Sequence, residues 1–270
     1  MTEIQSIFSL KGKTAIVTGA CGLIGRAQCK ALSEFGAAVA VCDIDISDKE
    51  EILLELNPES FAVQTDVSDI DSLTKSKEII LSRTGRIDIL VNNAAVNDIF
   101  TGQGLVKQSM FENYSLEFWN KSLEINVTGT FLSCRVFGSI IAQNGGGSII
   151  NIASTYGIVG PDQSIYTDET GNQKFYKSPS YPTGKGAILN FTRYLASYWG
   201  KNGVRVNTLS PGGVEDGQDN YFVENYSKRT MLRRMAKPSD YAGAVVFLAS
   251  EASSYMTGAN LVVDGGWTAW

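Results

Sequence analysis

The chain of 270 residues carries a net charge of −5, and 43% of its residues are hydrophobic. This size and composition suit a single α/β domain spanning 1–270, and an acidic balance without a basic run argues against nucleic-acid or anionic-membrane binding. Histidine is absent, which excludes His-based catalytic triads and His-ligated metals. We therefore expect no metal site, and proton transfer must use Tyr, Lys, Asp or Glu.

The first predicted strand, 13–18, runs directly into a glycine turn and a helical segment. Glycines let the backbone approach a pyrophosphate, and the helix that follows offers free N–H groups and the positive end of its dipole. This order predicts a dinucleotide site, although a tight turn that binds nothing has the same pattern. The predicted cofactor-binding residues of the turn are Gly19, Gly22, Leu23, Ile24 and Gly25.

Asp43 ends the second predicted strand, 37–43, and lies 18 residues after Gly25. An acid at this place can accept hydrogen bonds from both ribose hydroxyls of an adenosine, and it repels a 2′-phosphate. Neither of the next two residues is basic, so the pattern favours NAD over NADP. The alternative is that Asp43 merely caps a loop or helix, and Arg26 is the one nearby basic residue that could complicate the choice.

Further apolar, strand-like runs alternate with helical segments along the rest of the chain. Continuous apolar runs suit strands buried on both faces, and helices between them imply a parallel sheet covered on both sides. With right-handed crossovers, this order gives a doubly wound, Rossmann-like α/β fold. The predicted strands are 13–18, 37–43, 60–65, 87–92, 147–153, 204–209 and 260–263.

Four cysteines, Cys21, Cys29, Cys42 and Cys134, show no Cys-x-x-Cys spacing. We expect them to be reduced thiols in a cytoplasmic protein, with three of them in the core. No apolar window approaches the length of a transmembrane helix, so we expect none. The N-terminus lacks the basic and apolar segments of a signal peptide.

Asp66 and Val67 follow the third predicted strand. A carboxylate at this strand end can accept a hydrogen bond from the amino group of an adenine. Asp66 could equally be the N-cap of a helix that begins at about 69, and the two roles are compatible. We assign both residues to the predicted cofactor site.

The fourth predicted strand ends in Asn92, Asn93, Ala94 and Ala95. The small residues would let a cofactor pass closely over the strand end, and the asparagines can tie the loop to neighbouring strands. Further on, Asn126 falls in an apolar helical stretch. A buried amide needs partners, so Asn126 is either a structural bridge or part of a water-lined proton path.

Ser154 follows the predicted strand 147–153, Tyr181 comes 27 residues later, and Lys185 lies four residues beyond it. Tyr and Lys at this spacing share one helix face, and Pro182 fits the first turn of such a helix. A nearby ammonium or nicotinamide cation would lower the pKa of the tyrosine, which suits a general acid/base in a chain without histidine. Tyr-x-x-x-Lys is common by chance and gains weight here from its position after Ser154.

These motifs, in this order, resemble the short-chain dehydrogenase/reductase family over essentially the whole chain, including the segments 210–214 and 263–266. The resemblance implies that Tyr181 is the acid/base and that Lys185 lowers its pKa and binds the nicotinamide ribose. It implies that Ser154 hydrogen-bonds the substrate oxygen and that Asn126 holds a proton-relay water. The residues that would line the nicotinamide site are Pro211, Gly212 and Val214.

Two departures from the family pattern matter. Leu23 stands where the usual pattern has a glycine, and Gly22 takes over, as in the family's extended branch. The serine–tyrosine separation is about twice the family's usual value, which indicates an insertion at about 162–178. The strand-end position of Ser154 still favours it over Thr155.

The insertion and the segments 193–200 and 264–270 resemble a bacterial subgroup of flagellin-modification and surface-sugar oxidoreductases. That resemblance suggests a polyol or sugar-derived substrate. The polar and aromatic residues of the insertion suit a hydroxyl-rich ligand, but they equally suit an exposed loop. They are Tyr166, Asp168, Asn172, Gln173 and Tyr176.

A substrate lid is expected at about 214–236, with acids at its start and bases at its end. One arginine of the cluster Arg229, Arg233 and Arg234 could pair with a substrate phosphate or carboxylate. The alternative is that the cluster forms a solvated helix face.

The sequence thus predicts an NAD(H)-dependent dehydrogenase that interconverts a secondary alcohol and a ketone, in which the cofactor supplies the hydride chemistry. The aromatic end 267–270 is expected to contribute to a homotetramer. The alternatives are a 3-oxoacyl thioester reductase, which most often uses NADP, and a non-catalytic NAD-binding protein on the same fold.

Overall fold

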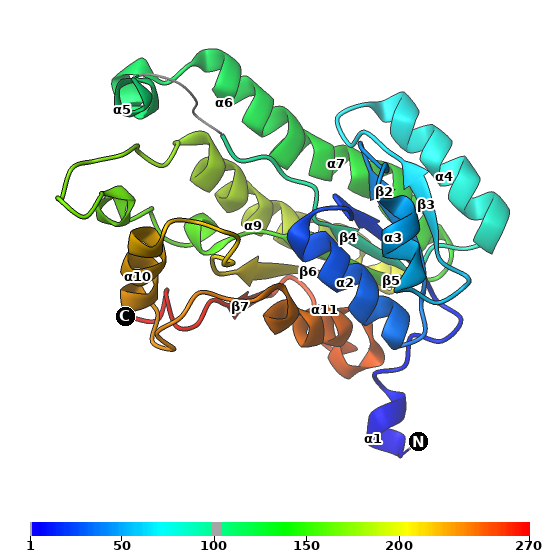
Figure 1. Cartoon of the computed structure of the whole chain (residues 1–270). Helices are drawn as coiled ribbons and strands as arrows, with labels where there is room; N and C mark the ends of the chain where they lie inside the picture. The colour runs from blue at the N-terminus through cyan, green and yellow to red at the C-terminus, as the bar shows by residue number, and fades with distance from the viewer. Residues whose placement is uncertain (1, 99–103) are drawn as a thin grey trace.

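The computed structural model describes residues 2–98 and 104–270. Its parallel strands form one sheet in the order β3-β2-β1-β4-β5-β6-β7, with helices on both faces (Figure 1). This is the predicted doubly wound fold, and the predicted strands end within two residues of the observed ones. The strands are β1 (Thr14–Thr18), β2 (Ala38–Asp43), β3 (Phe61–Gln64), β4 (Ile89–Asn92), β5 (Gly147–Ile152), β6 (Val204–Pro211) and β7 (Asn260–Val263).

One face of the sheet is covered by α2 (Leu23–Glu34) and α11 (Ala242–Ala249). Strand side chains alternate between faces, so Ala15 and Val17 of β1 enter this core together with apolar residues of both helices. Ile16, between them, enters the core on the opposite face. The continuous apolar run of β1 is therefore buried on both sides.

The opposite face is covered by α4 (Ile70–Thr84), α9 (Ser180–Trp199) and a long helical segment, Leu116–Gln143. Among the described residues, only this segment is long and apolar enough to cross a membrane by length and composition, which corrects the expectation that no such stretch exists. Its side chains Phe137 and Ile141 are buried in the core against the sheet. The segment therefore packs as a core helix of the fold.

The long helical segment contains two π-helical turns. It comprises α6 (Leu116–Leu123), a π-helical turn at Glu124–Gly129, α7 (Thr130–Ser133), a second π-helical turn at Cys134–Gly138, and α8 (Ser139–Gln143). The other α-helices are α1 (Glu3–Ser6), α3 (Lys49–Leu54), α5 (Leu105–Ser109) and α10 (Asn220–Arg229), and short 3-10 helices occur in the connections.

The four cysteines are free thiols, and Cys29, Cys42 and Cys134 are buried, as predicted.

The strand order reverses between β1 and β4. Strands β2 and β3 are added on one side of β1, and the chain then returns to place β4 on its other side. Such a reversal opens a crevice at the carboxyl ends of the strands, where open α/β sheets bind ligands. The candidate site lies at these ends.

Candidate active site

The glycine turn joins β1 to α2, and its backbone packs so closely on neighbouring backbone that two of its glycines have no room for a side chain. Gly19 has a φ of +62°, and a Cβ there would lie 2.7 Å from the Cα of Ala94. A Cβ on Gly25 would lie 2.2 Å from the carbonyl oxygen of Gly19. Gly19 therefore requires glycine because of its positive φ and its close approach to Ala94, and Gly25 requires glycine because α2 packs directly on the turn.

The same turn has room on its outer side. A Cβ on Gly22 would meet only the Gly19 oxygen, at an ordinary 3.5 Å. Gly22 is the N-cap of α2 and supplies no side-chain cap, so the first N–H groups of the helix can receive an anion. Leu23 is exposed at this helix start, while Ile24 packs against the core. These residues fit a pyrophosphate, as predicted for a dinucleotide site.

Asp43 lies at the end of β2 next to this turn. Its Oδ2 accepts a hydrogen bond from the Cys21 backbone N–H at 2.8 Å, which holds the carboxylate beside the glycine turn. Arg26, the basic residue that complicated the cofactor choice, forms ion pairs with Asp48 at 2.8 Å and Glu51 at 3.5 Å. Its charge is thus already compensated by two acids.

Asp66 does not cap the following helix. The N-cap of α4 is Asp69, whose side chain accepts the Asp71 N–H, so the capping alternative for Asp66 is wrong. The Oδ1 of Asp66 accepts from the backbone N–H and the hydroxyl of Ser68 at 2.8 and 2.6 Å. This local turn stabilises the loop after β3.

Val67 is buried and lies against Gly129 of the long helix. A Cβ on Gly129 would lie 2.8 Å from the Val67 Cγ2. Val67 therefore joins the strand end to the helix opposite.

The two asparagines at the end of β4 tie the site together, as predicted. The Asn93 Nδ2 donates to the backbone oxygens of Thr18 and Gly19 at 3.1 and 2.9 Å. The Asn92 Nδ2 donates to the Oδ1 of Asn151 on β5 at 2.8 Å. The loop with Ala94 and Ala95 is thereby fixed beside the glycine turn.

Asn126 is buried in the π-helical turn of the long helix. Its Oδ1 accepts the Val96 N–H at 2.8 Å, and its Nδ2 donates to the Val96 carbonyl at 2.9 Å and to the Ser122 hydroxyl at 3.2 Å. Of the two predicted roles, the side chain fulfils that of a structural bridge, since it holds the loop after β4.

Ser154, Tyr181 and Lys185 meet at the end of β5. Ser154 follows this strand, and Tyr181 and Lys185 lie one turn apart near the start of α9. The Lys185 Nζ donates to the Ile152 carbonyl at 2.8 Å and lies 5.8 Å from the centre of the Tyr181 ring. Pro182 is in the first turn of this helix, as predicted.

Burial dominates the protonation of this cluster. It raises the pKa of Tyr181, which a hydrogen bond with Ser154 in turn lowers. It also lowers the pKa of Lys185 to about 8. The predicted lowering of the tyrosine pKa is therefore not present in the chain by itself, because desolvation of the phenol outweighs the hydrogen bond.

Ser154 and its neighbour Thr155 point to different partners. The Ser154 hydroxyl interacts with the Tyr181 phenol, whereas the Thr155 hydroxyl hydrogen-bonds Tyr226 of α10. This arrangement supports the choice of Ser154 made from its place at the strand end.

The segment predicted to line the nicotinamide site follows β6. Pro211 ends this strand, and the Gly212 N–H donates to the Val263 carbonyl at 2.9 Å. Val214 forms a parallel bridge with Ala236, so the two ends of the predicted lid are joined directly.

Comparisons with known proteins agree with this geometry. A family model described as enoyl-(acyl carrier protein) reductase matches residues 19–268. D-threitol dehydrogenase of Mycolicibacterium smegmatis is 34% identical, with 99% of both chains covered. NAD-dependent glycerol dehydrogenase of Listeria innocua is 31% identical over 97% of this chain and 96% of its own.

The chain belongs to the short-chain dehydrogenase/reductase family. A solved gluconate 5-dehydrogenase from Burkholderia cenocepacia, in complex with NADP and tartrate, has a TM-score of 0.85 at 25% identity, covering 99% of this chain and 100% of that one. As a family member, the chain is an oxidoreductase that binds a nicotinamide cofactor and acts on alcohols.

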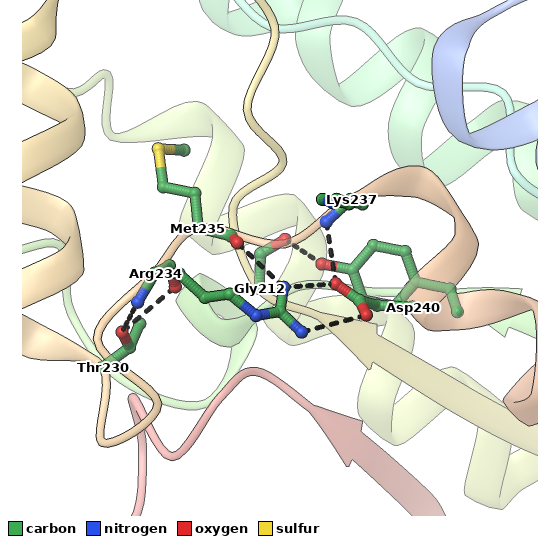
Figure 2. Close-up of polar contacts among 7 residues, drawn as sticks. Gly212, Thr230, Arg234, Met235, Lys237 and Asp240 are labelled. Atoms are coloured by element: carbon green, nitrogen blue, oxygen red, sulfur yellow. Dashed lines mark hydrogen bonds and ion pairs between the residues drawn. The ribbon is translucent and has the colours of Figure 1, made fainter.

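In this short-chain dehydrogenase/reductase, the lid arginines have protein partners. Arg234 donates to both carboxylate oxygens of Asp240, at 2.6 and 3.0 Å, and to the Met235 carbonyl at 3.0 Å (Figure 2). Arg233 donates to the Lys228 carbonyl at 2.7 Å and lies over the Trp270 ring.

Arg229 forms an ion pair with Asp162 of the insertion. The charges of Arg229 and Arg234 are thus already paired with carboxylates, which weakens the hypothesis for these two, whereas Arg233 has no ion pair among the described residues. They are also not simply solvated, because each has a partner in the protein.

The insertion of this family member packs against the lid. Tyr166 lies 4.8 Å from the Phe175 ring and 5.5 Å from the Phe222 ring of α10, measured between centroids. Lys174 forms an ion pair with Asp219, the N-cap of α10, at 2.8 Å. Insertion and lid therefore form one wall at the end of the molecule where α10 lies (Figure 1).

Most of the polar insertion residues that suited a ligand instead hold the loop. The Asp168 Oδ1 accepts the backbone N–H groups of Thr170 and Asn172, and the Gln173 Nε2 donates to the Gln163 and Phe175 carbonyls. Tyr166 and Tyr176 differ, because both line a cavity between the insertion and α10.

Sequence reasoning missed Lys177, whose Nζ lies 4.4 Å from the centre of the Tyr181 ring. It also missed a small network beside it, in which Tyr114 and Ser180 both hydrogen-bond Asp98. The available signal was a basic residue four positions before the predicted acid/base. Lys177 precedes α9, which begins at Ser180, so helical spacing alone did not place it beside Tyr181.

Proposed function

We propose that the chain is an NAD(H)-dependent dehydrogenase that interconverts a secondary alcohol and a ketone on a polyol, sugar or sugar acid. The observation that carries this proposal is the meeting of Ser154, Tyr181 and Lys185 at the carboxyl end of β5, beside a turn that fits a dinucleotide. Relatives named threitol, glycerol and galactitol dehydrogenases support the substrate class.

Each residue of the cluster has a separate task in this proposal. The cofactor supplies the hydride chemistry. Tyr181 exchanges the proton of the substrate hydroxyl, Ser154 hydrogen-bonds the same oxygen, and Lys185 holds positive charge near the phenol. Asn126 keeps the loop after β4 in place and would hold the relay water through which the proton leaves.

The cofactor would lie along the strand ends. Its pyrophosphate would meet the start of α2, its adenine the loop with Asp66 and Val67, and its nicotinamide the segment Pro211, Gly212 and Val214. Beneath the cofactor would lie Asn93, Ala94 and Ala95. We propose that residues 1–270 form a single NAD-binding domain, which includes the insertion at 162–178 and the lid at 214–236.

We expect Asp43→Ala to lower kcat/KM for NAD by about tenfold to a hundredfold, because the ribose hydroxyls lose a charge-assisted acceptor. The ratio of NADP to NAD efficiency should rise in the same variant, since the charge that repels a 2′-phosphate is gone. Steady-state kinetics with both cofactors measures this. A wild-type enzyme that prefers NADP would contradict the proposed NAD specificity.

A screen for cofactor reduction tests the function itself. NAD and NADP are run in parallel against polyols, sugars and sugar acids, with acetoacetyl-CoA reduction as the test of the thioester reductase alternative. NAD-dependent oxidation of a polyol or sugar that is lost in Tyr181→Phe supports the proposal. Reduction of the thioester alone would overturn it, and NADH binding without turnover would favour a non-catalytic protein.

We also infer a cytoplasmic homotetramer. Exposed aromatic side chains on neighbouring helices, Phe131 of α7 and Tyr194 and Tyr198 of α9, are candidates for subunit contact. At the C-terminus, Trp270 is 67% exposed, whereas Trp267 is buried and stacks on Tyr226 within the same chain.

We expect Trp270→Ala to weaken assembly with little loss of subunit stability, because the contacts of this exposed ring within its own chain, a hydrogen bond to the Arg229 carbonyl and the Arg233 guanidinium, lie at the surface. Deleting 267–270 also removes the stacked Trp267, so the single substitution is the cleaner test. Light scattering at graded protein concentrations measures the mass. An equally stable tetramer in the variant would show that this end lies outside the interface.

The narrower resemblance to surface-sugar and flagellin-modification oxidoreductases remains part of this proposal. It rests on the insertion together with the segments 193–200 and 264–270, and the insertion lines the cavity that contains Lys177. Nucleotide-linked sugars therefore belong in the screen.

A further inference from the structure

Lys177 is a cation at the substrate end of the site. It belongs to the insertion, is half-buried, and its Nζ lies 4.4 Å from the centre of the Tyr181 ring and 6.0 Å from that of Tyr156. Tyr181 is the residue whose hydroxyl must meet the reacting carbon–oxygen bond. A group bound by the Lys177 ammonium would therefore lie close to that bond.

The backbone of Lys177 is held firmly. Its N–H donates to the Gln163 Oε1 at 2.8 Å, and its carbonyl accepts from the Gln163 Nε2 at 3.2 Å. The preceding residue, Tyr176, donates its N–H to the Ser109 hydroxyl at 2.8 Å. Because the loop is fixed on both sides, the ammonium is presented without the entropic cost of ordering a mobile segment.

Lys177 has no ion pair among residues 2–98 and 104–270. Its Nζ donates to one neutral acceptor, the Asn97 Oδ1, at 2.7 Å. The nearby Asp98 carboxylate accepts hydrogen bonds from Tyr114 and Ser180. Lys174, three residues earlier, is by contrast fully paired with Asp219 at 2.8 Å.

A cavity of about 350 Å³ opens at this ammonium, between the insertion, the loop after β4 and α10. Its lining is mixed, with the apolar rings of Tyr166, Phe175 and Phe222 opposite polar groups. Desolvation there lowers the pKa of Lys177 to about 8, while the charge of Asp98 raises it. A half-buried cation without an ion pair gains most from an anion, because a neutral hydroxyl cannot offset the lost hydration of its charge.

We propose that Lys177 is a substrate-binding residue that selects hydroxy acids, by pairing its ammonium with the substrate carboxylate. This inference rests on the proposed dehydrogenase function and narrows its substrate class from polyols in general to sugar acids. The hydroxy-acid chain would extend from the carboxylate at Lys177 to the secondary alcohol at Tyr181 and Ser154.

The test compares substrates that differ only in the group meeting Lys177. D-gluconate and D-glucitol share one hydroxyl pattern, as do D-threonate and D-threitol, and each pair exchanges a carboxylate for a CH₂OH. We expect Lys177→Met to lower the ratio of acid to polyol kcat/KM by about tenfold or more, mainly through KM for the acid. Lys177→Arg should recover part of the ratio.

Lys174→Met is the matched control, because it removes a lysine of the same insertion and cavity whose charge is already paired. Its effect on the ratio should be much smaller. The inference is overturned if Lys177→Met reduces acid and polyol activity equally, if it leaves the ratio unchanged, or if Lys174→Met lowers the ratio as much.

The pH dependence of the ratio provides a second readout. Below pH about 8 the wild-type ammonium is charged and binds the carboxylate, and above it the ratio should fall as Lys177 deprotonates. Lys177→Met should show a low, flat ratio. Two further tyrosines, Tyr156 and Tyr181, lie under the Lys177 ammonium. The other titratable groups of its cavity are Asp98, Tyr166, Lys174, Tyr176 and Asp219.

A binding measurement separates this inference from the proposed function. If no acid or polyol is turned over, the proposed function fails, and D-gluconate is titrated into the NADH-loaded protein by fluorescence. Tighter binding to wild type than to Lys177→Met still supports the carboxylate site. Equal binding, or none, overturns it.

Discussion

Tyr181→Phe is expected to lower kcat by about 10²–10⁴-fold, the usual contribution of a positioned acid/base group. The substitution removes only the hydroxyl, so the ring keeps its packing in the aromatic cluster that joins α10 and the insertion. NADH affinity and melting temperature should therefore stay close to wild type. Stopped-flow and steady-state measurements with the best substrate from the screen give the rate, and fluorescence gives the affinity.

Tyr156→Phe is the matched control for this experiment. Tyr156 lies in the same aromatic cluster, and its hydroxyl hydrogen-bonds that of Tyr166 at 3.0 Å. Losing that hydroxyl should cost some stability and little rate, because it is not placed to exchange a proton with the substrate. If the two variants lose similar activity, Tyr181 has no special role in proton transfer.

Gly25→Ala is expected to destabilise the protein by about 1–3 kcal/mol and to weaken NAD binding strongly. The new Cβ would lie 2.2 Å from the Gly19 carbonyl oxygen and 2.8 Å from the Ala20 Cα, so α2 must move away from the turn. Both contacts are with backbone atoms, which cannot rotate aside. Thermal or urea unfolding and NADH titration measure the two effects.

Gly22→Ala separates stability from cofactor binding at the same turn. A Cβ on Gly22 meets only the Gly19 oxygen at 3.5 Å, so unfolding should change by less than about 0.5 kcal/mol. NAD affinity should still fall, because the methyl group would face the anion proposed to bind at the start of α2. Unchanged affinity in this variant would argue against a pyrophosphate at this turn.

The glycine turn and the strand ends could be predicted because their signals are local. A buried parallel strand is a short continuous apolar run, and the spacing of Gly19, Gly22 and Gly25 records the sharp turn that follows β1. The helical period likewise places Tyr181 and Lys185 on one face without any knowledge of the rest of the fold. These features needed few long-range contacts to be correct.

The roles of polar residues were harder to predict, because partners decide them. The sequence left Asn126 open between a structural bridge and a proton path, and only its hydrogen bonds to Val96 show that its side chain is a bridge. Asp66 was weighed as a helix cap, yet α4 begins after Asp69. A shift of three residues in a helix start exchanges one capping side chain for another.

The amino-acid sequence by itself therefore determined the sheet, the cofactor turn and the pair of Tyr181 and Lys185, since periodicity and spacing are properties of neighbouring residues. Only the tertiary structure decided which basic residue faces the site. Arg229 pairs with Asp162 and Lys174 with Asp219, across long intervals of sequence, whereas Lys177 has no such acid within the described residues. Charge alone does not reveal which cation is unpaired, because pairing depends on distances that only the folded chain sets.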